Sequence, residues 1–140
     1  MYLLDTDHLS ILQRGGAESL RLTVRLSEVT DSEIVTCIVV YEEQMRGWLA
    51  QGARGRTSKE WLLSYDDLAA NLEVHCNLTL LAFDTRAAAR FDELKNAKIN
   101  IGTQDLKIAA IALVNEATVL TRNTRHFSKI PDLLFEDWTI

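Results

Sequence analysis

The chain opens with a short apolar run that ends in acids, Tyr2-Leu3-Leu4-Asp5-Thr6-Asp7. This run predicts a buried strand, and we expect a short helix capped by Thr6 or Asp7 to follow it. A β-branched stretch, Ile34-Val35-Thr36-Cys37-Ile38, predicts a second strand after an intervening helical segment. Strands that alternate with helices are typical of parallel βαβ units. The two stretches therefore indicate an α/β fold.

The same alternation continues to the end of the chain. Further strands are expected at residues 78–83 and 118–121, with an edge strand at 133–135. Thr57 and Glu60 have capping-box spacing, and Asp84 is expected to cap a later helix. The predicted helices cover residues 17–29, 39–50, 85–97, and the segments that begin at residues 57 and 103. We therefore expect a single domain over residues 1–140, a three-layer α/β/α fold with a short, mainly parallel sheet.

The composition narrows the class of protein. The 140 residues carry a net charge of −5, which argues against non-specific nucleic-acid binding through a broad basic face. Clustered carboxylates could still hold a divalent cation that meets a phosphate. Cys37 and Cys76 form no disulfide framework or metal-ligand spacing, and neither a signal peptide nor a membrane-spanning run is expected. The prediction is a reduced cytoplasmic protein without a membrane segment.

Acidic residues fall at three predicted junctions between strands and helices. Asp5 follows the first strand, Glu42 and Glu43 lie near the start of the helix after the second strand, and Asp105 lies in the first turn of a later helix. In a parallel sheet these junctions share one edge. Buried like charges need a cation, and Mg²⁺ or Mn²⁺ would suit carboxylate ligands. Each acid alone could equally be a helix-dipole or solvated residue, so it is their joint placement that favours a metal site.

The segment after the fourth predicted strand runs from Thr121 to Phe127. Asn123 could bind a metal or its water, and Arg122 or Arg125 could receive a phosphate, although a plain turn explains the segment as well. The three histidines, including His126, have no ligand spacing and are expected to be structural or exposed.

Four motifs resemble the signatures of PIN domains. They are Leu3–Asp7, Thr36–Gly47, Ile101–Ala112, and Thr121–Asn123 with His126-Phe127. Their order and spacing cover nearly the whole chain, and the resemblance is strongest to VapC-type toxins of bacterial toxin–antitoxin pairs. Gln44 departs from the pattern, because the residue at that position is usually aliphatic.

The resemblance implies a Mg²⁺- or Mn²⁺-dependent endoribonuclease that hydrolyses RNA. It also implies a homodimer and a small antitoxin that occupies the active-site groove. By position, Asp5 and Asp105 match the family's metal-binding aspartates, and Glu43 matches its glutamate because it lies four residues before Gly47, with Glu42 as the alternative. Asn123 stands where the family often has a fourth acid.

Three residues are candidate contacts to the substrate phosphates. Thr6 could approach the phosphate, although a helix cap is its expected role. Arg122 and Arg125 are the candidate substrate contacts near Asn123.

Two other functions are weighed against the nuclease. Asp5 and Asp7 form an Asp-x-Asp pair like that of haloacid-dehalogenase-type phosphatases, but His8-Leu9 follows instead of a small turn. A non-catalytic binding module with an acidic groove is the second alternative, since an intact site does not by itself establish turnover.

Overall fold

The computed structural model describes all residues, 1–140, and contains one five-stranded parallel sheet. The strand order is β3-β2-β1-β4-β5, and every neighbouring pair is parallel. The strands are β1 (Tyr2–Leu4), β2 (Ile34–Cys37), β3 (Thr79–Leu81), β4 (Thr118–Leu120) and β5 (Phe135–Glu136). The predicted α/β architecture is confirmed. The predicted fifth strand does lie at a sheet edge, but it begins at Phe135.

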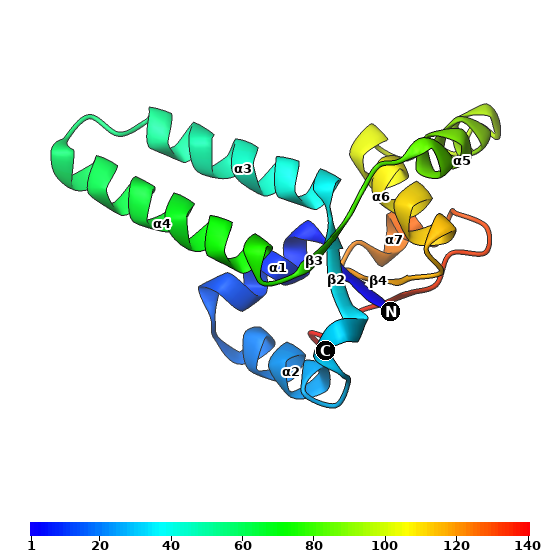
Figure 1. Ribbon diagram of the computed structural model, residues 1–140, viewed down its shortest axis with the longest axis horizontal. Helices are drawn as coiled ribbons and strands as arrows, with labels where there is room; N and C mark the ends of the chain where they lie inside the picture. The colour runs from blue at the N-terminus through cyan, green and yellow to red at the C-terminus, as the bar shows by residue number, and fades with distance from the viewer.

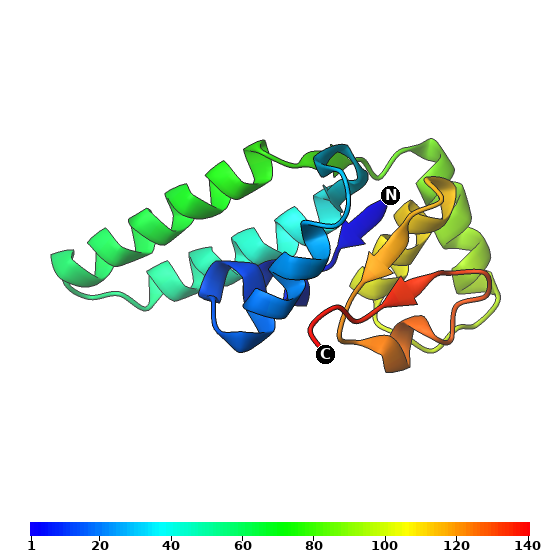
Figure 2. The same cartoon turned by 90° about the horizontal axis from the view of Figure 1, so that it is seen from below.

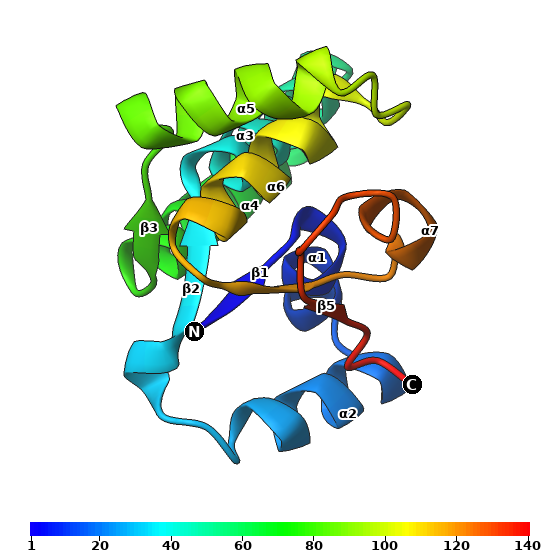
Figure 3. The same cartoon turned by 90° about the vertical axis from the view of Figure 1, so that its right-hand side faces the viewer.

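Helices connect these strands and cover the sheet. They are α1 (Thr6–Arg14), α2 (Ala17–Leu26), α3 (Ile38–Ala53), α4 (Ser58–Cys76), α5 (Thr85–Asn96), α6 (Thr103–Val114) and α7 (Thr124–Phe127), with a 3₁₀ turn, η1 (Asp31–Glu33), before β2. In Figure 3, α5 and α6 lie above the sheet and α2 lies below it. None of the helices is both long enough and apolar enough to cross a membrane.

Helices α3 and α4 form an antiparallel arm. Figures 1 and 2 show this pair extending well beyond the sheet, while the remaining helices stay close to it. The capping box predicted at the start of α4 is present, because Thr57 Oγ1 accepts from the Glu60 amide and the Glu60 side chain accepts from the Thr57 amide. The loop that precedes this box therefore turns the chain back along α3.

The start of α1 differs from the prediction. Asp5 is the N-cap, and its Oδ1 accepts a hydrogen bond from the Thr6 amide at 2.7 Å. The expectation that Thr6 or Asp7 caps this helix is wrong, because β1 ends at Leu4 and the helix begins at once with Thr6. The side chain of Thr6 is consequently free to act elsewhere.

The carboxyl ends of the inner strands meet at one edge of the sheet. Leu4 of β1 is in register with Leu120 of β4, and the Asp5 amide donates to the Leu120 carbonyl at 3.0 Å. On the other side, Thr36 of β2 donates its hydroxyl to the Leu4 carbonyl at 3.1 Å. The residues that follow β1, β2 and β4 are thereby brought together, as is usual for ligand sites in parallel sheets.

Candidate active site

Asp5 lies at the centre of a group of acids at the carboxyl edge of the sheet. We call this group, Asp5, Glu43 and Asp105, the acidic edge. The Asp5 side chain is buried, with only 5% of the residue exposed, and both carboxylate oxygens are bonded. Oδ1 accepts from the Thr6 amide, and Oδ2 accepts from the Thr121 hydroxyl at 2.8 Å. Two elements that are more than a hundred residues apart therefore fix the orientation of this carboxylate.

Burial raises the pKa of Asp5 to about 7, and the charges of Asp7 and Asp105 add to the effect. The hydrogen bonds from Thr121 and Thr6 act in the opposite direction but do not offset the burial. Near neutral pH this carboxyl group is thus poised between its protonated and charged forms. A nearby cation would favour the charged form.

Glu43, in the second turn of α3, faces the same centre. Its carboxylate accepts a short hydrogen bond from the Thr6 hydroxyl. Burial raises the pKa of Glu43, as do the charges of Asp105 and Glu42, while the Thr6 hydrogen bond and Arg46 lower it. The role expected for Thr6 as a cap is therefore corrected: Thr6 ties α1 to the carboxylate of Glu43.

Glu42 points in a different direction from Glu43. Its Oε1 accepts from Gln104 Nε2 at 2.8 Å and lies 3.3 Å from the Arg46 guanidinium. Adjacent residues on a helix project about 100° apart, so only one of the two glutamates can face Asp5. The structure brings Glu43 toward this centre and turns Glu42 to its rim.

Asp105, in the first turn of α6, is held by two nitrogen donors. Its Oδ2 lies 3.0 Å from Asn123 Nδ2 and 2.8 Å from His126 Nδ1. The backbone amide of Asn123 in turn donates to the Thr121 hydroxyl at 3.0 Å, and that hydroxyl donates to Asp5 Oδ2. A continuous set of contacts therefore connects the two aspartates through the segment after β4.

His126 was expected to be structural or exposed; its side chain is 42% exposed and also contacts Asp105. His126 Nδ1 donates to Asp105 Oδ2 when it carries the ring proton, and in that tautomer its 2.8 Å approach to Asn123 Nδ2 is not a second hydrogen bond. The three-residue spacing of Asn123 and His126 is compatible with their mutual contact, but it does not indicate the contact of His126 with Asp105, which lies on another helix.

Asp7 and Arg122 lie beside this centre. Asp7 Oδ2 accepts from the Arg122 amide at 2.9 Å, and its Oδ1 lies 2.9 Å from His8 Nδ1. The Arg122 guanidinium makes an exposed pair with Glu18 at 3.4 Å. Arg125 is exposed on α7 and forms no salt bridge. Both arginines therefore border the acidic edge without neutralising its carboxylates.

The side chains at this edge are oxygen donors of the kind that divalent cations prefer. No group of three or more His, Cys, Asp or Glu side chains is already arranged around a common metal position. The charge of Asp105 nevertheless raises the pKa of both Asp5 and Glu43, and neither of these two carboxylates forms an ion pair with a lysine or arginine. Hard oxygen donors with uncompensated charge suit Mg²⁺ or Mn²⁺. The residue chemistry thus fits a metal, with some adjustment of the side chains on binding.

The fold and this acidic edge define the class of the protein. The PIN domain family matches residues 2–133, so the chain belongs to the PIN-domain family. Ribonuclease VapC1 of Haemophilus influenzae (strain R2866) is 26% identical over 99% of this chain and 98% of its own length. A local match to Ribonuclease VapC2 of Rickettsia felis is 41% identical over 46 residues, which is 33% of this chain and 34% of that protein.

Solved structures agree with the assignment of the fold. VapBC-1 from nontypeable Haemophilus influenzae superposes with a TM-score of 0.77 at 23% identity, over 99% of this chain and 98% of that one. A toxin–antitoxin complex from Klebsiella pneumoniae gives a TM-score of 0.70 at 19% identity, over 96% of each chain. The predicted PIN fold and the resemblance to VapC-type toxins are confirmed.

Proposed function

We propose that this chain is a Mg²⁺- or Mn²⁺-dependent endoribonuclease and the toxin of a toxin–antitoxin pair. PIN-domain ribonucleases are generally metal-dependent, and the full-length relative is named a ribonuclease. The observation that carries the proposal is the placement of Asp5, Glu43 and Asp105 at one sheet edge, where burial, and to a smaller extent the charge of Asp105, raises the pKa of Asp5 and of Glu43. Such perturbed carboxylates mark sites built for a charged ligand.

Asp5, Glu43 and Asp105 are the residues that would hold the metal. When bound, a divalent ion supplies Lewis-acid polarisation of the scissile phosphate and lowers the pKa of a bound water. The chain contributes orientation: Thr121 fixes Asp5, and Thr6 fixes Glu43. Asn123 and His126 both hold Oδ2 of Asp105, and Oδ1 of that carboxylate makes no hydrogen bond within the protein. We assign Asn123 and His126 as positioning residues.

The surrounding cations would receive the RNA backbone. Arg125 is exposed beside Asn123, and Arg122 is engaged only by an exposed partner that a phosphate could displace. Thr6 lies within the same group of side chains and could donate to a phosphate once Glu43 is engaged by a cation. These three residues form the proposed substrate contacts.

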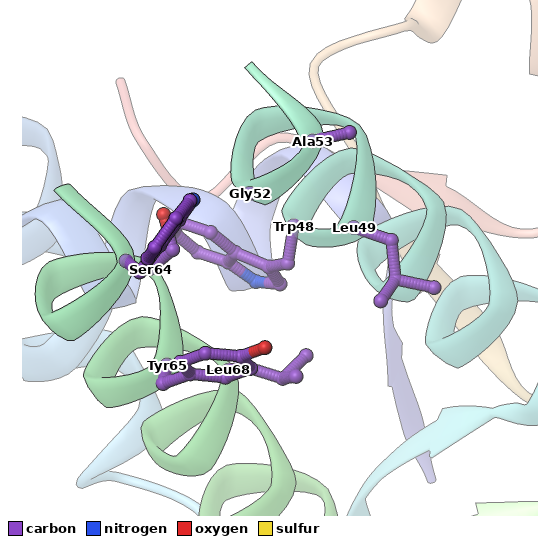
Figure 4. Close-up of a pocket in the computed structure, with 8 residues that line it drawn as sticks. Trp48, Leu49, Gly52, Ala53, Ser64, Tyr65 and Leu68 are labelled. Atoms are coloured by element: carbon purple, nitrogen blue, oxygen red, sulfur yellow. The ribbon is translucent and has the colours of Figure 1, made fainter. Parts of the chain in front are cut away.

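The arm is the proposed surface for protein partners. Trp61, Tyr65 and Leu72 of α4 are 47%, 70% and 53% exposed, which is unusual for side chains of this size. Trp48 of α3 and Tyr65 and Leu68 of α4 line a cavity of about 460 Å³ between the two helices (Figure 4). A homodimer and a small cognate antitoxin would bury this apolar surface, so sedimentation should reveal a dimer across micromolar concentrations; a monomer would contradict the homodimer.

The two alternatives fare differently. A phosphatase would need Asp7 to present a carboxylate toward substrate, but both of its oxygens are engaged, by the Arg122 amide and by His8. A non-catalytic module with an acidic groove has no such obstacle, because it needs the same carboxylates without turnover. Only a measurement of cleavage separates this module from the nuclease.

The deciding experiment is the cleavage of labelled structured RNA with Mg²⁺, Mn²⁺ or EDTA, by the wild type beside Asp105→Ala. We expect metal-dependent cleavage that falls roughly 10³-fold or more in the variant, as is common when a group essential to the chemistry is removed. Circular dichroism should show that the variant remains folded. Full activity in folded Asp105→Ala would contradict the site. If the wild type neither cleaves RNA nor binds metal, the binding module is the better description.

A further inference from the structure

A second hollow opens beside the acidic edge, between the start of α3, the end of β3 and α6. Its volume is about 520 Å³. Its lining combines aromatic and aliphatic side chains with two cations. It includes Ile38, Tyr41, Met45, Arg46, Phe83 and Lys107. We call it the α3–α6 pocket. It is separate from the cavity between the helices of the arm, although Leu49 borders both.

The α3–α6 pocket begins where the candidate active site ends. Glu42, which lines the pocket, is the neighbour of Glu43, and Lys107 lies two residues after Asp105. A bonded chain forms the shared rim: Lys107 Nζ donates to Gln104 Oε1 at 3.0 Å, and Gln104 Nε2 donates to Glu42 Oε1 at 2.8 Å. The hydrogen-bonded residues Glu42, Gln104 and Lys107 therefore lie on the side of the pocket that continues into the segments carrying Glu43 and Asp105.

Two aromatic rings of the pocket have fixed orientations. Phe83, which is 37% exposed, packs edge-on against Phe91 with ring centroids 6.2 Å apart. Tyr41 packs edge-on against His75 at 5.0 Å. Edge-to-face contacts of this kind leave a ring face available and reduce the conformational entropy lost when a flat ligand stacks on it. The pocket is thus suited to a planar group.

The charges at the mouth favour an anion beside that planar group. Arg46 has a side chain that is 71% exposed and meets Glu42 only at 3.3 Å, while Lys107 contacts a neutral amide and no carboxylate. The chain as a whole has a net charge of −5, so two cations at the edge of an apolar hollow make this part of the surface locally more favourable for an anion. An acidic or purely apolar peptide would use only one of these two features.

We propose that the α3–α6 pocket receives one unstacked nucleobase of the RNA strand, next to the scissile phosphate, with Arg46 and Lys107 on flanking phosphates. The inference rests on the proposed ribonuclease function and adds to it a subsite for one base. A base inside a duplex cannot enter a hollow of this kind, whereas a splayed base can stack on aromatic side chains. The nucleotide whose base enters the pocket is therefore unpaired when it binds.

The test pairs one protein change with one substrate change. Phe83→Ala and the wild type are compared on a labelled single-stranded RNA that the wild type cuts, and on the same RNA with one abasic nucleotide beside the cut. Loss of the base should lower wild-type kcat/KM about 10-fold, the usual size of a stacking contact, and should have little effect on Phe83→Ala. An equal abasic effect in both proteins at every position near the cut would overturn the proposal.

The matched control is Leu80→Ala, which removes an apolar side chain of similar exposure (41% against 37% for Phe83) from β3, outside the pocket. It should keep the wild-type response to the abasic RNA. If Phe83→Ala instead converts a dimer into a monomer while leaving RNA cleavage and its abasic response unchanged, the pocket is an interface between copies of this chain and the proposal is wrong.

A binding measurement separates failure of this inference from failure of the proposed function. A labelled oligouridine of about 12 nucleotides is titrated against Asp105→Ala in Mg²⁺, with and without Lys107→Gln. Removal of one phosphate contact should reduce the slope of log affinity against log salt by about 0.7, while Lys59→Gln on α4 should not change it. Equal slopes for Lys107→Gln and Lys59→Gln would overturn the cation role even if the wild type cleaves RNA.

Discussion

The acidic edge and the α3–α4 arm use burial in opposite ways. At the edge, hydrogen bonds from distant segments hold carboxylates that would otherwise repel one another, such as Thr121 with Asp5 and His126 with Asp105. Along the arm, large apolar side chains such as Tyr65 and Leu72 face solvent. No lysine or arginine forms an ion pair with Asp5, Glu43 or Asp105, and no other part of the chain covers the exposed apolar side chains of the arm. This difference is the basis for proposing a cation as the ligand of the edge and a protein surface as the ligand of the arm.

The two regions meet at a buried polar cluster at the root of the arm. Gln44 of α3 bonds His75 of α4 at 2.9 Å and Ser10 of α1 at 3.3 Å, and Gln13 bonds Asn71 at 3.1 Å. Gln44, which departs from the usual aliphatic residue, is thus the centre of this cluster. Burial lowers the pKa of His75, so its neutral form is favoured, and its Nδ1 has no partner. The hydrogen bonds of this cluster therefore fix how α3, α4 and α1 meet without using charged side chains.

Replacement of Glu43 and of Glu42 by glutamine, one at a time, is the strongest test within the acidic edge. Glu43→Gln should lower metal-dependent cleavage roughly 100-fold, because it removes a charged oxygen from the cation site, while Glu42→Gln should change it by less than about 5-fold. The comparison is made on kcat/KM for one labelled RNA at saturating Mg²⁺. The reverse order would show that α3 presents Glu42 to the metal.

His126 tests whether the clamp on Asp105 matters beyond folding. His126→Ala should lower cleavage about 10-fold and raise the Mg²⁺ concentration needed for half-maximal thermal stabilisation, because one donor to Asp105 is lost. His126→Asn places an amide donor near the position of Nδ1 and should recover most of both losses. If both variants behave alike, or if only stability changes without a shift in metal dependence, the positioning role is wrong.

The protonation of Asp5 links the edge to pH. An acid whose folded-state pKa is raised stabilises the native state least in its charged form, so metal-free stability should fall as pH rises from about 4 to about 7 and then level off. Asp5→Asn should remove that slope and be more stable than the wild type at pH 8 without metal, by up to about a few kcal/mol. It should also lose the stabilisation by Mg²⁺. Urea unfolding at pH 4.5, 6 and 8 measures these effects; an unchanged slope in Asp5→Asn would assign it to another group.

Much of the edge could be predicted from the sequence, because parallel strands force their carboxyl ends together. That rule placed Asp5 and Asp105 near one another with no knowledge of side-chain directions. The caps at Asp84 and Thr57 were equally local and were confirmed. What local patterns do not contain is rotation about a helix axis. The contact of Thr6 with Glu43 depends on where α1 begins and how α3 is turned, which tertiary packing decides.

The arm shows the complementary limit. The spacing of Trp61 and Leu72 along α4 is typical of an apolar stripe, but such a stripe does not show what covers it. In this chain α4 packs against α3 and reaches the sheet only near its carboxyl end, so part of the stripe remains exposed (Figure 1). His126 was missed for a related reason: its partner Asp105 is 21 residues away and belongs to another helix.

The smallest expected effect comes from the arm's own capping box. Thr57→Ala removes the hydroxyl that accepts from the Glu60 amide, and loss of such a cap typically costs about 1 kcal/mol. Because Thr57 lies at the far end of the arm from the acidic edge, RNA cleavage at a temperature well below unfolding should be unchanged. Thr57→Ser keeps the cap and should retain wild-type stability. Denaturant unfolding together with kcat/KM measures both quantities. A loss of cleavage in folded Thr57→Ala would show that the arm and the edge are energetically coupled, so that the two regions could no longer be treated as separate parts of the molecule.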